Sequence, residues 1–505
     1  MPPHTLQEKL SALLHSPWDL VRRPFTIERL QFELIYLKGL VKEERLDEAI
    51  IRPLQHFLTT TGPDSAQELL SIAHVFSSAF ITSTETRTIE SPEEAANLLL
   101  EGWALLLPLD SQFLTAVYLP GWTRRKPQEP TGEKSLRGPR EGFTEDLLDN
   151  VTLIRRWIKD PNLRVEEKTI GKRTRTKVVL VFLADLASPT LVTEVNKRLD
   201  AIEIDAVLES GYLEELITDD RLTVFPLIQA TERSDKVTAA LLEGRVAILV
   251  DKSPSALVVP VTINELYQSP EDYYLGYWLG SLLRLIRLTG NNLAILLPGL
   301  YVALVQVNPE LLPTRLMINI AGLRANVPFP LILEVAFIAF ALEIFFESSI
   351  RLPQPVASVG GVVTGIVLGY ASLQAGIVSS PTLVVMIVAT ISLYSGPNYS
   401  MSIAWRILKY FLLLGAALFG VFGLNLFAVL ILAHTATLQS FGVSYLAPWA
   451  PLQPPALADG PLRKPLWLKK RRFSTYRPLD KKRQGNTRGE DSPALRKEGD
   501  EDKET

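Results

Sequence analysis

Three long stretches without charged residues constrain this sequence more than any other feature. Leu288–Val307 contains 20 residues and no charge, and Leu352–Trp405 contains 54 residues with neither charge nor histidine. Tyr410–Ala458 contains 49 residues, of which only His434 titrates near neutral pH. A membrane-spanning helix needs about 20 mainly apolar residues, because its backbone polar groups must be satisfied within the helix. One such helix could be buried in a soluble protein, but a succession of them predicts a membrane domain.

The expected membrane domain covers residues 284–440 and has about five hydrophobic segments. The third segment is rich in glycine and alanine, which permit close approach of helices. The fifth is long and contains three glycines, so it is either one tilted helix or a bent, partly re-entrant one. The segments lie near residues 288–307, 328–346, 357–378, 381–397 and 408–433.

The signals for topology conflict. No apolar signal peptide precedes the first segment, so the N-terminal region is expected to stay cytoplasmic. Arg284 and Arg287 flank that segment as juxtamembrane basic residues and agree with the positive-inside rule, and Arg351 is a third candidate of this kind. The basic cluster Arg463–Arg483 should lie on the same side, which requires an even number of crossings. Five segments therefore leave two possibilities: one of them is re-entrant or interfacial, which we favour, or the tail lies outside.

Charge is distributed unevenly along the 505 residues. Residues 1–287 carry a net charge of −9, residues 288–460 a net charge of 0, and residues 461–505 a net charge of +6. An acidic front, a nearly uncharged middle and a basic tail are typical of a membrane protein with two aqueous ends. The acidic front argues against nucleic-acid binding, and the membrane segments imply contact with lipids.

Two parts of the front are similar in pattern. Leu99-Leu-Glu-Gly102 and Leu241-Leu-Glu-Gly244 each read as a helix end with a glycine stop, and two short apolar strands follow each one. Upstream, the apolar runs Phe32–Leu37 and Lys177–Leu183 each precede a helical pattern. Since the order is the same in both parts, the sequence predicts a duplicated α/β module, with chance similarity of apolar runs as the alternative.

The predicted fold is therefore an α/β soluble N-terminal region of two similar subdomains, then an all-α polytopic membrane domain and a disordered basic tail. The subdomains are expected at residues 1–122 and 143–283, joined by a linker at 123–142 that is rich in Pro, Gly, Lys and Arg. The tail, 441–505, is expected to be cytosolic or disordered, because its basic part is charged and poor in apolar residues.

Sequence motifs give no positive sign of catalysis. No phosphate-binding loop, dinucleotide fingerprint, metalloprotease helix or nucleophile elbow is present. The chain has no cysteine, and its five histidines are scattered. We therefore expect a protein that is not an enzyme and has no catalytic, cofactor-binding or metal-binding residues.

Three acidic residues in or at the end of the second hydrophobic segment are the candidate pore or gating acids. An ionised group in hydrocarbon costs a few kcal/mol, so Glu334, Glu343 and Glu347 should face water, a partner or a pore. A ring of such carboxylates around an oligomer axis would favour cations. The alternative is that Glu343 and Glu347 lie at the interface, with Glu347 paired to Arg351 one turn later.

Several motifs resemble the GerA family of spore germination proteins from endospore-forming Firmicutes. They include Arg137–Glu145, Leu242–Asp251, Val327-Pro-Phe-Pro330 with Glu334, and Ser440-Phe-Gly442. The resemblance extends from about Phe32 to Pro465. The chain departs from the usual pattern in having Ser234 for proline, Lys252 for glycine, and only Asp459-Gly460 for an acidic segment after the last span.

The resemblance implies the A subunit of a nutrient receptor in the spore inner membrane, with its soluble region on the cytoplasmic side. Such subunits are expected to oligomerise into a ligand-gated cation channel. They work with a transporter-like B subunit and a lipoprotein C subunit. Alternatives are a secondary transporter, which would show inverted repeats, or a membrane-anchored scaffold similar to stage V sporulation protein AF.

Overall fold

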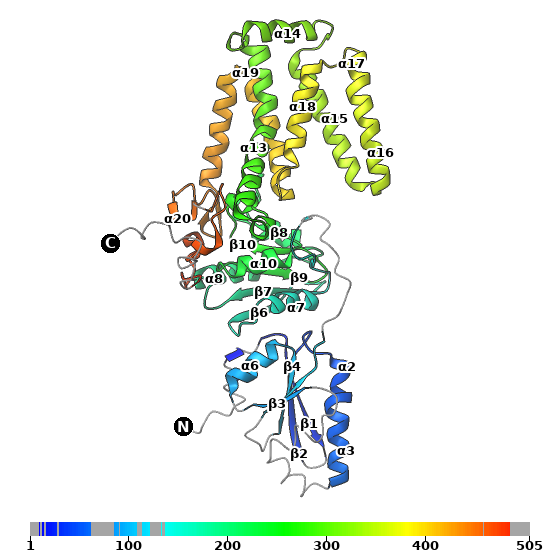
Figure 1. The fold of residues 1–505 in the computed structure, drawn as a ribbon, viewed down its shortest axis with the longest axis vertical. Helices are drawn as coiled ribbons and strands as arrows, with labels where there is room; N and C mark the ends of the chain where they lie inside the picture. Colours follow the sequence, from blue (N-terminus) through cyan, green and yellow to red (C-terminus); the bar gives the residue numbers. More distant parts are fainter. Residues whose placement is uncertain are drawn as a thin grey trace, which may run out of the picture. The chain divides into compact units, whose positions relative to one another are not determined.

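The computed structural model divides the chain into two compact units (Figure 1). The first contains residues 1–219, 228–260 and 467–505, and the second contains residues 220–227 and 261–466. The structure describes residues 10, 13–14, 17–27, 30–61, 85–89, 91–108, 114–121, 133, 137–457 and 459–484.

The first unit contains two five-stranded sheets, and all strand pairs in both are antiparallel. The first sheet has the order β1-β2-β4-β5-β3 and the second the order β6-β7-β9-β10-β8. The first set of strands is β1 (Leu20–Ile27), β2 (Leu30–Leu37), β3 (Thr86–Ile89), β4 (Trp103–Pro108) and β5 (Leu114–Tyr118). The second is β6 (Leu163–Ile170), β7 (Thr176–Leu183), β8 (Gln229–Thr231), β9 (Val246–Val250) and β10 (Ala256–Val259).

The identical strand order confirms that the soluble region consists of two similar α/β parts. In both parts a helix ends immediately before the central hairpin, and the stop is a glycine with a left-handed backbone. Gly102 has φ of 86° and Gly244 has φ of 85°, a conformation that costs glycine no steric clash. The first set of helical segments is α2 (Glu43–Leu46), η1 (Asp47–Ile51), α3 (Arg52–Thr61) and α6 (Pro92–Leu100). The second is α7 (Leu147–Trp157), α8 (Pro189–Asp200), α9 (Ser210–Ile217) and α10 (Ser234–Leu241).

A buried ion pair joins the two parts of the first unit. Arg155 on α7 donates from Nε and Nη2 to both carboxylate oxygens of Asp19, at 2.5 and 2.7 Å. Their side chains are 2% and 1% exposed. Because the bidentate geometry satisfies both charged groups, the pair fixes the segment before β1 against α7.

The second unit is mainly helical, as predicted for residues 284–440. Its long helices are α13 (Tyr277–Val302), α15 (Leu331–Arg351), α18 (Ser380–Leu393) and α19 (Tyr399–Thr437). The shorter helical segments are α11 (Ile263–Leu266), α12 (Glu271–Tyr274), η2 (Ala303–Val307), η3 (Pro309–Leu311), α14 (Thr314–Arg324), α16 (Gln354–Thr364), η4 (Gly365–Ala371), α17 (Ser372–Gln374) and α20 (Pro454–Leu457). A small hairpin of β11 (Gln439–Ser440) and β12 (Val443–Ser444) follows α19.

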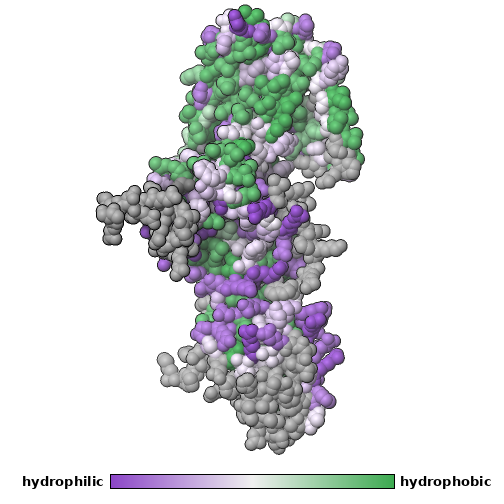
Figure 2. All heavy atoms as spheres, in the orientation of Figure 1, coloured by the Kyte–Doolittle hydropathy of each residue, from purple (hydrophilic) through white to green (hydrophobic). Residues whose placement is uncertain are grey.

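Two helical stretches among the described residues are long and apolar enough to cross a membrane. Tyr277–Val307 has 31 residues and Tyr399–Thr437 has 39. Figure 2 shows that the helical part of the second unit presents a mainly hydrophobic surface on the visible face. Phe340, Ile391 and Phe422, on three different helices, are 64%, 66% and 71% exposed. A large exposed apolar surface indicates contact with lipid or with other protein.

The last hydrophobic segment is a helical hairpin, which is the bent alternative of the two that the sequence left open. Gly420 has φ of 62° and ψ of −140°, so the helix reverses direction there. Phe411 and Phe427 on the two arms lie with ring centroids 4.6 Å apart. A Cβ on Gly423 would overlap the carbonyl oxygen of Gly415, so the arms meet at glycines. The structure therefore has two helical arms where the sequence predicted one segment.

The expected tail is ordered over the residues that the structure describes. Phe473 N donates to Glu243 Oε2 at 3.1 Å, Arg483 pairs with the same carboxylate, and Leu479 N donates to Leu186 O at 3.0 Å. The expectation of disorder does not hold for residues 461–484, because contacts such as those with Glu243 and Leu186 hold the segment in place. Residues 458 and 485–505 of the tail, and 123–132 and 134–136 of the expected linker, lie outside the described residues.

Candidate functional site

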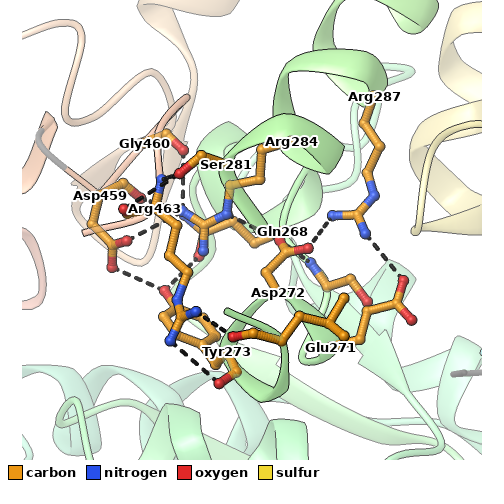
Figure 3. Close-up of polar contacts among 12 residues, drawn as sticks. Gln268, Glu271, Asp272, Tyr273, Ser281, Arg284, Arg287, Asp459, Gly460 and Arg463 are labelled. Carbon is orange, nitrogen blue, oxygen red and sulfur yellow. Dashed lines mark hydrogen bonds and ion pairs between the residues drawn. The ribbon is translucent and has the colours of Figure 1, made fainter. Parts of the chain in front are cut away.

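The first turns of α13 bear the two predicted juxtamembrane arginines, and both point inward. Arg284 and Arg287 are 3% and 7% exposed. Their inner face also carries Gly280 and Ser281, because residues three or four apart share one side of a helix. Figure 3 shows the polar network that surrounds them.

Asp272 on α12 is shared by the two arginines. Its Oδ2 accepts from Arg284 Nε at 3.0 Å and its Oδ1 accepts from Arg287 Nη1 at 2.6 Å. Arg287 Nη2 also donates to Glu271 Oε1 at 3.1 Å. Asp272 is 0% exposed, and such a buried carboxylate is tolerated only with strong charged partners.

Arg284 also contacts the segment that follows α19 and its hairpin. Arg284 Nη1 lies 3.2 Å from Asp459 Oδ1 and donates to the carbonyl oxygens of Asp459 and Gly460 at 2.9 and 3.2 Å. Arg463 Nη1 donates to Leu275 O at 2.5 Å, and its backbone N donates to Ser281 Oγ at 3.0 Å. The segment after the hairpin is therefore attached to the start of α13.

Tyr273 completes the network. Its hydroxyl donates to Asp459 Oδ2 at 2.9 Å, and the guanidinium carbon of Arg284 lies 5.1 Å from its ring centroid. Burial, and then the charge of Asp459, raises the pKa of Tyr273, so the phenol remains a hydrogen-bond donor. Arg284 and Arg287 pair with Glu271, Asp272 and Asp459, and Arg463 donates to backbone carbonyls beside them. The network thus contains three cationic and three anionic side chains.

Glu334, the first candidate acid, lies inside the helical unit. Its residue is 1% exposed, and Oε2 accepts hydrogen bonds from the hydroxyls of Ser379, at 2.9 Å, and Thr382. Oε1 lies 3.5 Å from Arg324 Nε. Because Ser379 is the residue before α18, this carboxylate fixes the N-terminus of that helix to the start of α15.

Glu343, the second candidate acid, is paired with two basic residues of α19. Oε2 accepts from Arg406, with Nε at 2.6 Å, and Oε1 lies 3.1 Å from Lys409 Nζ. The three side chains are 21%, 16% and 11% exposed. Two cations facing one anion give this cluster an excess of positive charge when all three side chains are ionised. The carboxylate is thus already satisfied by α19.

Glu347 is the exposed member of the three acids. It pairs with Arg351, with Oε1 2.5 Å from Nη2, and the two side chains are 57% and 78% exposed. This is the i, i+4 pair that the sequence left open as an alternative. The structure therefore separates the three acids, with Glu334 and Glu343 in different buried networks and Glu347 on the surface.

Sequence reasoning missed the partners of these residues. Asp459 lies 175 residues from Arg284 in sequence, so only the fold brings the two together. Arg406 and Lys409 did give a signal, since they are the sole Lys or Arg residues between Arg351 and Arg463 and are spaced to share one helix face. A lone basic pair beside an apolar block indicates a buried acidic partner.

The described residues contain no group of three or more His, Cys, Asp or Glu side chains placed to hold a metal ion. Among known families, the model of the Bacillus/Clostridium GerA spore germination protein matches residues 8–475. The chain belongs to the GerA family. The motifs from which the resemblance was inferred lie within the matched region.

Individual relatives are similar to this chain over most of their length. Spore germination protein B1 of Bacillus subtilis (strain 168) is 37% identical over 451 residues, covering 89% of this chain and 92% of that protein. Membrane protein YfkQ of the same strain, whose function is uncharacterized, is 35% identical over 470 residues, covering 93% and 90%. The crystallised N-terminal domain of the A subunit of the Bacillus megaterium germinant receptor GerK3 is 29% identical with a TM-score of 0.38, covering 49% of this chain and 91% of that one.

Proposed function

We propose that this GerA protein is the A subunit of a germinant receptor and oligomerises into a nutrient-gated cation channel in the spore inner membrane. Its soluble region would lie on the cytoplasmic side, and its partners would be a transporter-like B subunit and a lipoprotein C subunit. Family membership and the names of its relatives support a role in spore germination. The two long apolar helices support the membrane location.

The proposal of an oligomer rests on α16, a helix with several exposed apolar side chains. Figure 1 shows α16 on the far side of α15, apart from α13 and α19. Val359, Val362 and Ile366 on this segment are 64%, 65% and 58% exposed. A Cβ added at Gly360 or Gly365 would meet nothing within 4 Å. A glycine-bearing face of this kind permits close approach of a helix from a second copy.

The three acids take different parts in the proposed channel. Glu347 is exposed, so in an oligomer it can face an aqueous path and attract cations. Glu343 has two competing cationic partners on α19, so a shift of α15 along α19 would exchange one ion pair for the other. Glu334 fixes α18 to α15 and would move with them. We therefore assign Glu343 and Glu334 to the gate and Glu347 to the pore lining.

Nutrient binding to a partner subunit would act by shifting a closed–open equilibrium. Moving a gate from 1:99 to 99:1 requires about 5.5 kcal/mol of differential binding. Contacts across several subunits can supply that amount. The neutral network around Arg284 would transmit the shift, because it fixes the start of α13 to the segment after the hairpin.

Single-channel recording on the full-length protein with its partner subunits tests the proposal. Nutrient should open a cation current, Glu347→Gln should lower cation selectivity, and Glu347→Asp, which keeps the charge, should preserve it. Glu343→Gln should change the open probability of the channel and leave its cation selectivity unchanged. Absence of current from the intact complex would instead support a scaffold, and uptake in a fixed ratio to a second solute would support a transporter.

A further inference from the structure

A small cavity lies among four helices of the second unit, α13, α15, α18 and α19. Its volume is about 20 Å³, which is room for one water molecule or an ion of similar size. Apolar side chains such as Leu342 and Leu393 form much of its wall. Among the described residues that line it, the charged ones are Glu343, Arg406 and Lys409.

The wall of the cavity carries more positive than negative charge. Arg406 Nε donates to Glu343 Oε2 at 2.6 Å, and Lys409 Nζ lies 3.1 Å from Glu343 Oε1. The side chains of Arg406 and Lys409 are 16% and 11% exposed. Because one carboxylate faces two cations at a mostly buried position, one positive charge has no counter-charge among the described residues of the wall.

Aromatic rings lie beside both cations. The guanidinium carbon of Arg406 is 4.3 Å from the ring centroid of Phe346, and Lys409 Nζ is 4.8 Å from that of Tyr410. The face of an aromatic ring attracts a cation and therefore favours the ionised form of each side chain. The rings bring no negative charge, so the excess positive charge of the wall remains.

Both cations also have N–H groups left for a further partner. Arg406 uses Nε and Nη2 for Glu343, and its Nη1 makes no hydrogen bond with a described residue. Lys409 has three N–H donors and uses one of them for Glu343. The spare donors thus belong to two positively charged groups, which form their strongest hydrogen bonds with anions.

We propose that this cavity binds a small monovalent anion of the size of chloride. Such an anion would accept hydrogen bonds from the spare N–H groups and cancel the excess charge, whereas a water molecule would leave the charge uncompensated. A carboxylate or phosphate group is several atoms across and does not fit in about 20 Å³. A metal cation would be repelled by the excess positive charge of the wall.

Anion binding in this cavity depends on neither oligomerisation nor conductance. The anion and Glu343 would share the same two cations, so the site would affect the gate only if the proposed channel function holds. A protein that carries no current could still bind the anion, and a conducting protein could fail to bind it.

Thermal melting of the purified full-length protein in detergent tests the site. Sodium chloride should raise the melting temperature of wild type saturably above that in sodium gluconate at equal ionic strength, because gluconate is too large for the cavity. Lys409→Met should weaken the apparent affinity for chloride by at least about tenfold, since the remaining pair of Arg406 and Glu343 is neutral. Arg351→Met is the matched control, because it removes a cation from the exposed pair with Glu347 on the same helix, α15. Its chloride affinity should stay within about twofold of wild type.

A second variant with the opposite expectation keeps the test sharp if Lys409→Met folds poorly. Glu343→Gln leaves both cations to the ligand, so chloride should bind at least about threefold more tightly, as measured by broadening of the ³⁵Cl NMR line. Absence of a saturable chloride effect on wild type, which is the result expected if Lys409 is uncharged, would overturn the proposal. Equal chloride affinity in wild type and Lys409→Met, or unchanged or weaker binding by Glu343→Gln, would overturn it as well.

Discussion

Arg284 and Asp459 form a buried ion pair across 175 residues of sequence, with Nη1 3.2 Å from Oδ1. Their side chains are 3% and 1% exposed. All the long apolar helices except the start of α13 lie between them. The chain must therefore return to the end of the helical unit at which it entered, which is possible only with an even number of passes.

Removing one member of this pair should destabilise the protein strongly. Asp459→Ala removes one of the two carboxylates that pair with Arg284 at a buried position, and such losses cost about 3–5 kcal/mol. We expect a marked fall in the melting temperature of the detergent-purified protein. Arg351→Ala, which breaks the exposed pair with Glu347, should change stability by less than about 1 kcal/mol. Equal effects of the two changes would contradict the assigned role of the buried pair.

The family departure at Lys252 gives a prediction in the opposite direction. Lys252 has φ of 67°, a left-handed conformation that costs a residue with a Cβ about 1–2 kcal/mol. Its backbone N donates to Glu145 O at 2.9 Å, a bond that any non-proline residue can keep. Lys252→Gly should therefore raise the free energy of unfolding by about 1 kcal/mol. Lys252→Ala, which keeps the Cβ, should give no gain, and a gain of equal size would refute the conformational explanation.

The departure at Ser234 has a different physical meaning. Ser234 is the first residue of α10, a position that proline fits well because its N–H is not needed there. The serine Oγ donates to Glu141 O at 3.1 Å instead. At position 234 the hydrogen bond of the serine replaces the conformational advantage of proline. At position 252 nothing replaces the glycine that the left-handed backbone favours.

The soluble fold was predictable because it depends on local patterns. Short apolar strands, helix ends and the glycine stops at Gly102 and Gly244 all appear in the sequence, so the duplication could be inferred before the strand order was known. The outer strands β1 and β6 were missed, since their exposed polar residues hide the alternation. The pairing of edge strands depends on tertiary context more than on propensity.

The candidate site was less predictable because its residues act through distant partners. The sequence indicated Arg284 and Glu343 as important, but their environments depend on Asp459 and Arg406, which are far away in the chain. The hairpin at Gly420 was left open for a similar reason. Glycine permits a reversal without requiring one, and only the contact of the two arms decides it.

Glu214 should make the stability of the soluble region depend on pH. Burial, and then the negative charge of Glu209, raises the pKa of Glu214 to about 7. The folded state therefore holds this proton more tightly than the unfolded state. The contribution is fully present below the unfolded pKa of 4.5 and is lost as pH rises through about 7.

Glu214→Gln should remove that dependence. The variant should melt higher than wild type at about pH 8, by the equivalent of 1–3 kcal/mol at most, and close to wild type at about pH 4. Glu215→Gln, at the exposed neighbouring position, is the control and should follow wild type at both pH values. Identical pH profiles for wild type and Glu214→Gln would show that the carboxyl group titrates normally.

The reversal at Gly420 predicts which positions are reached from the same side of the membrane. Its arms, residues 399–419 and 421–437, are about 30 and about 25 Å long at 1.5 Å per residue, so each can cross the hydrocarbon once. The chain has no cysteine, so single substitutions can be labelled cleanly with a membrane-impermeant maleimide. Tyr399→Cys and Gln439→Cys should react from one side, and Phe422→Cys at the tip from the other. A straight helix would place Tyr399 and Gln439 on opposite sides, and labelling in that pattern would refute both the hairpin and the even number of passes required by the Arg284–Asp459 pair.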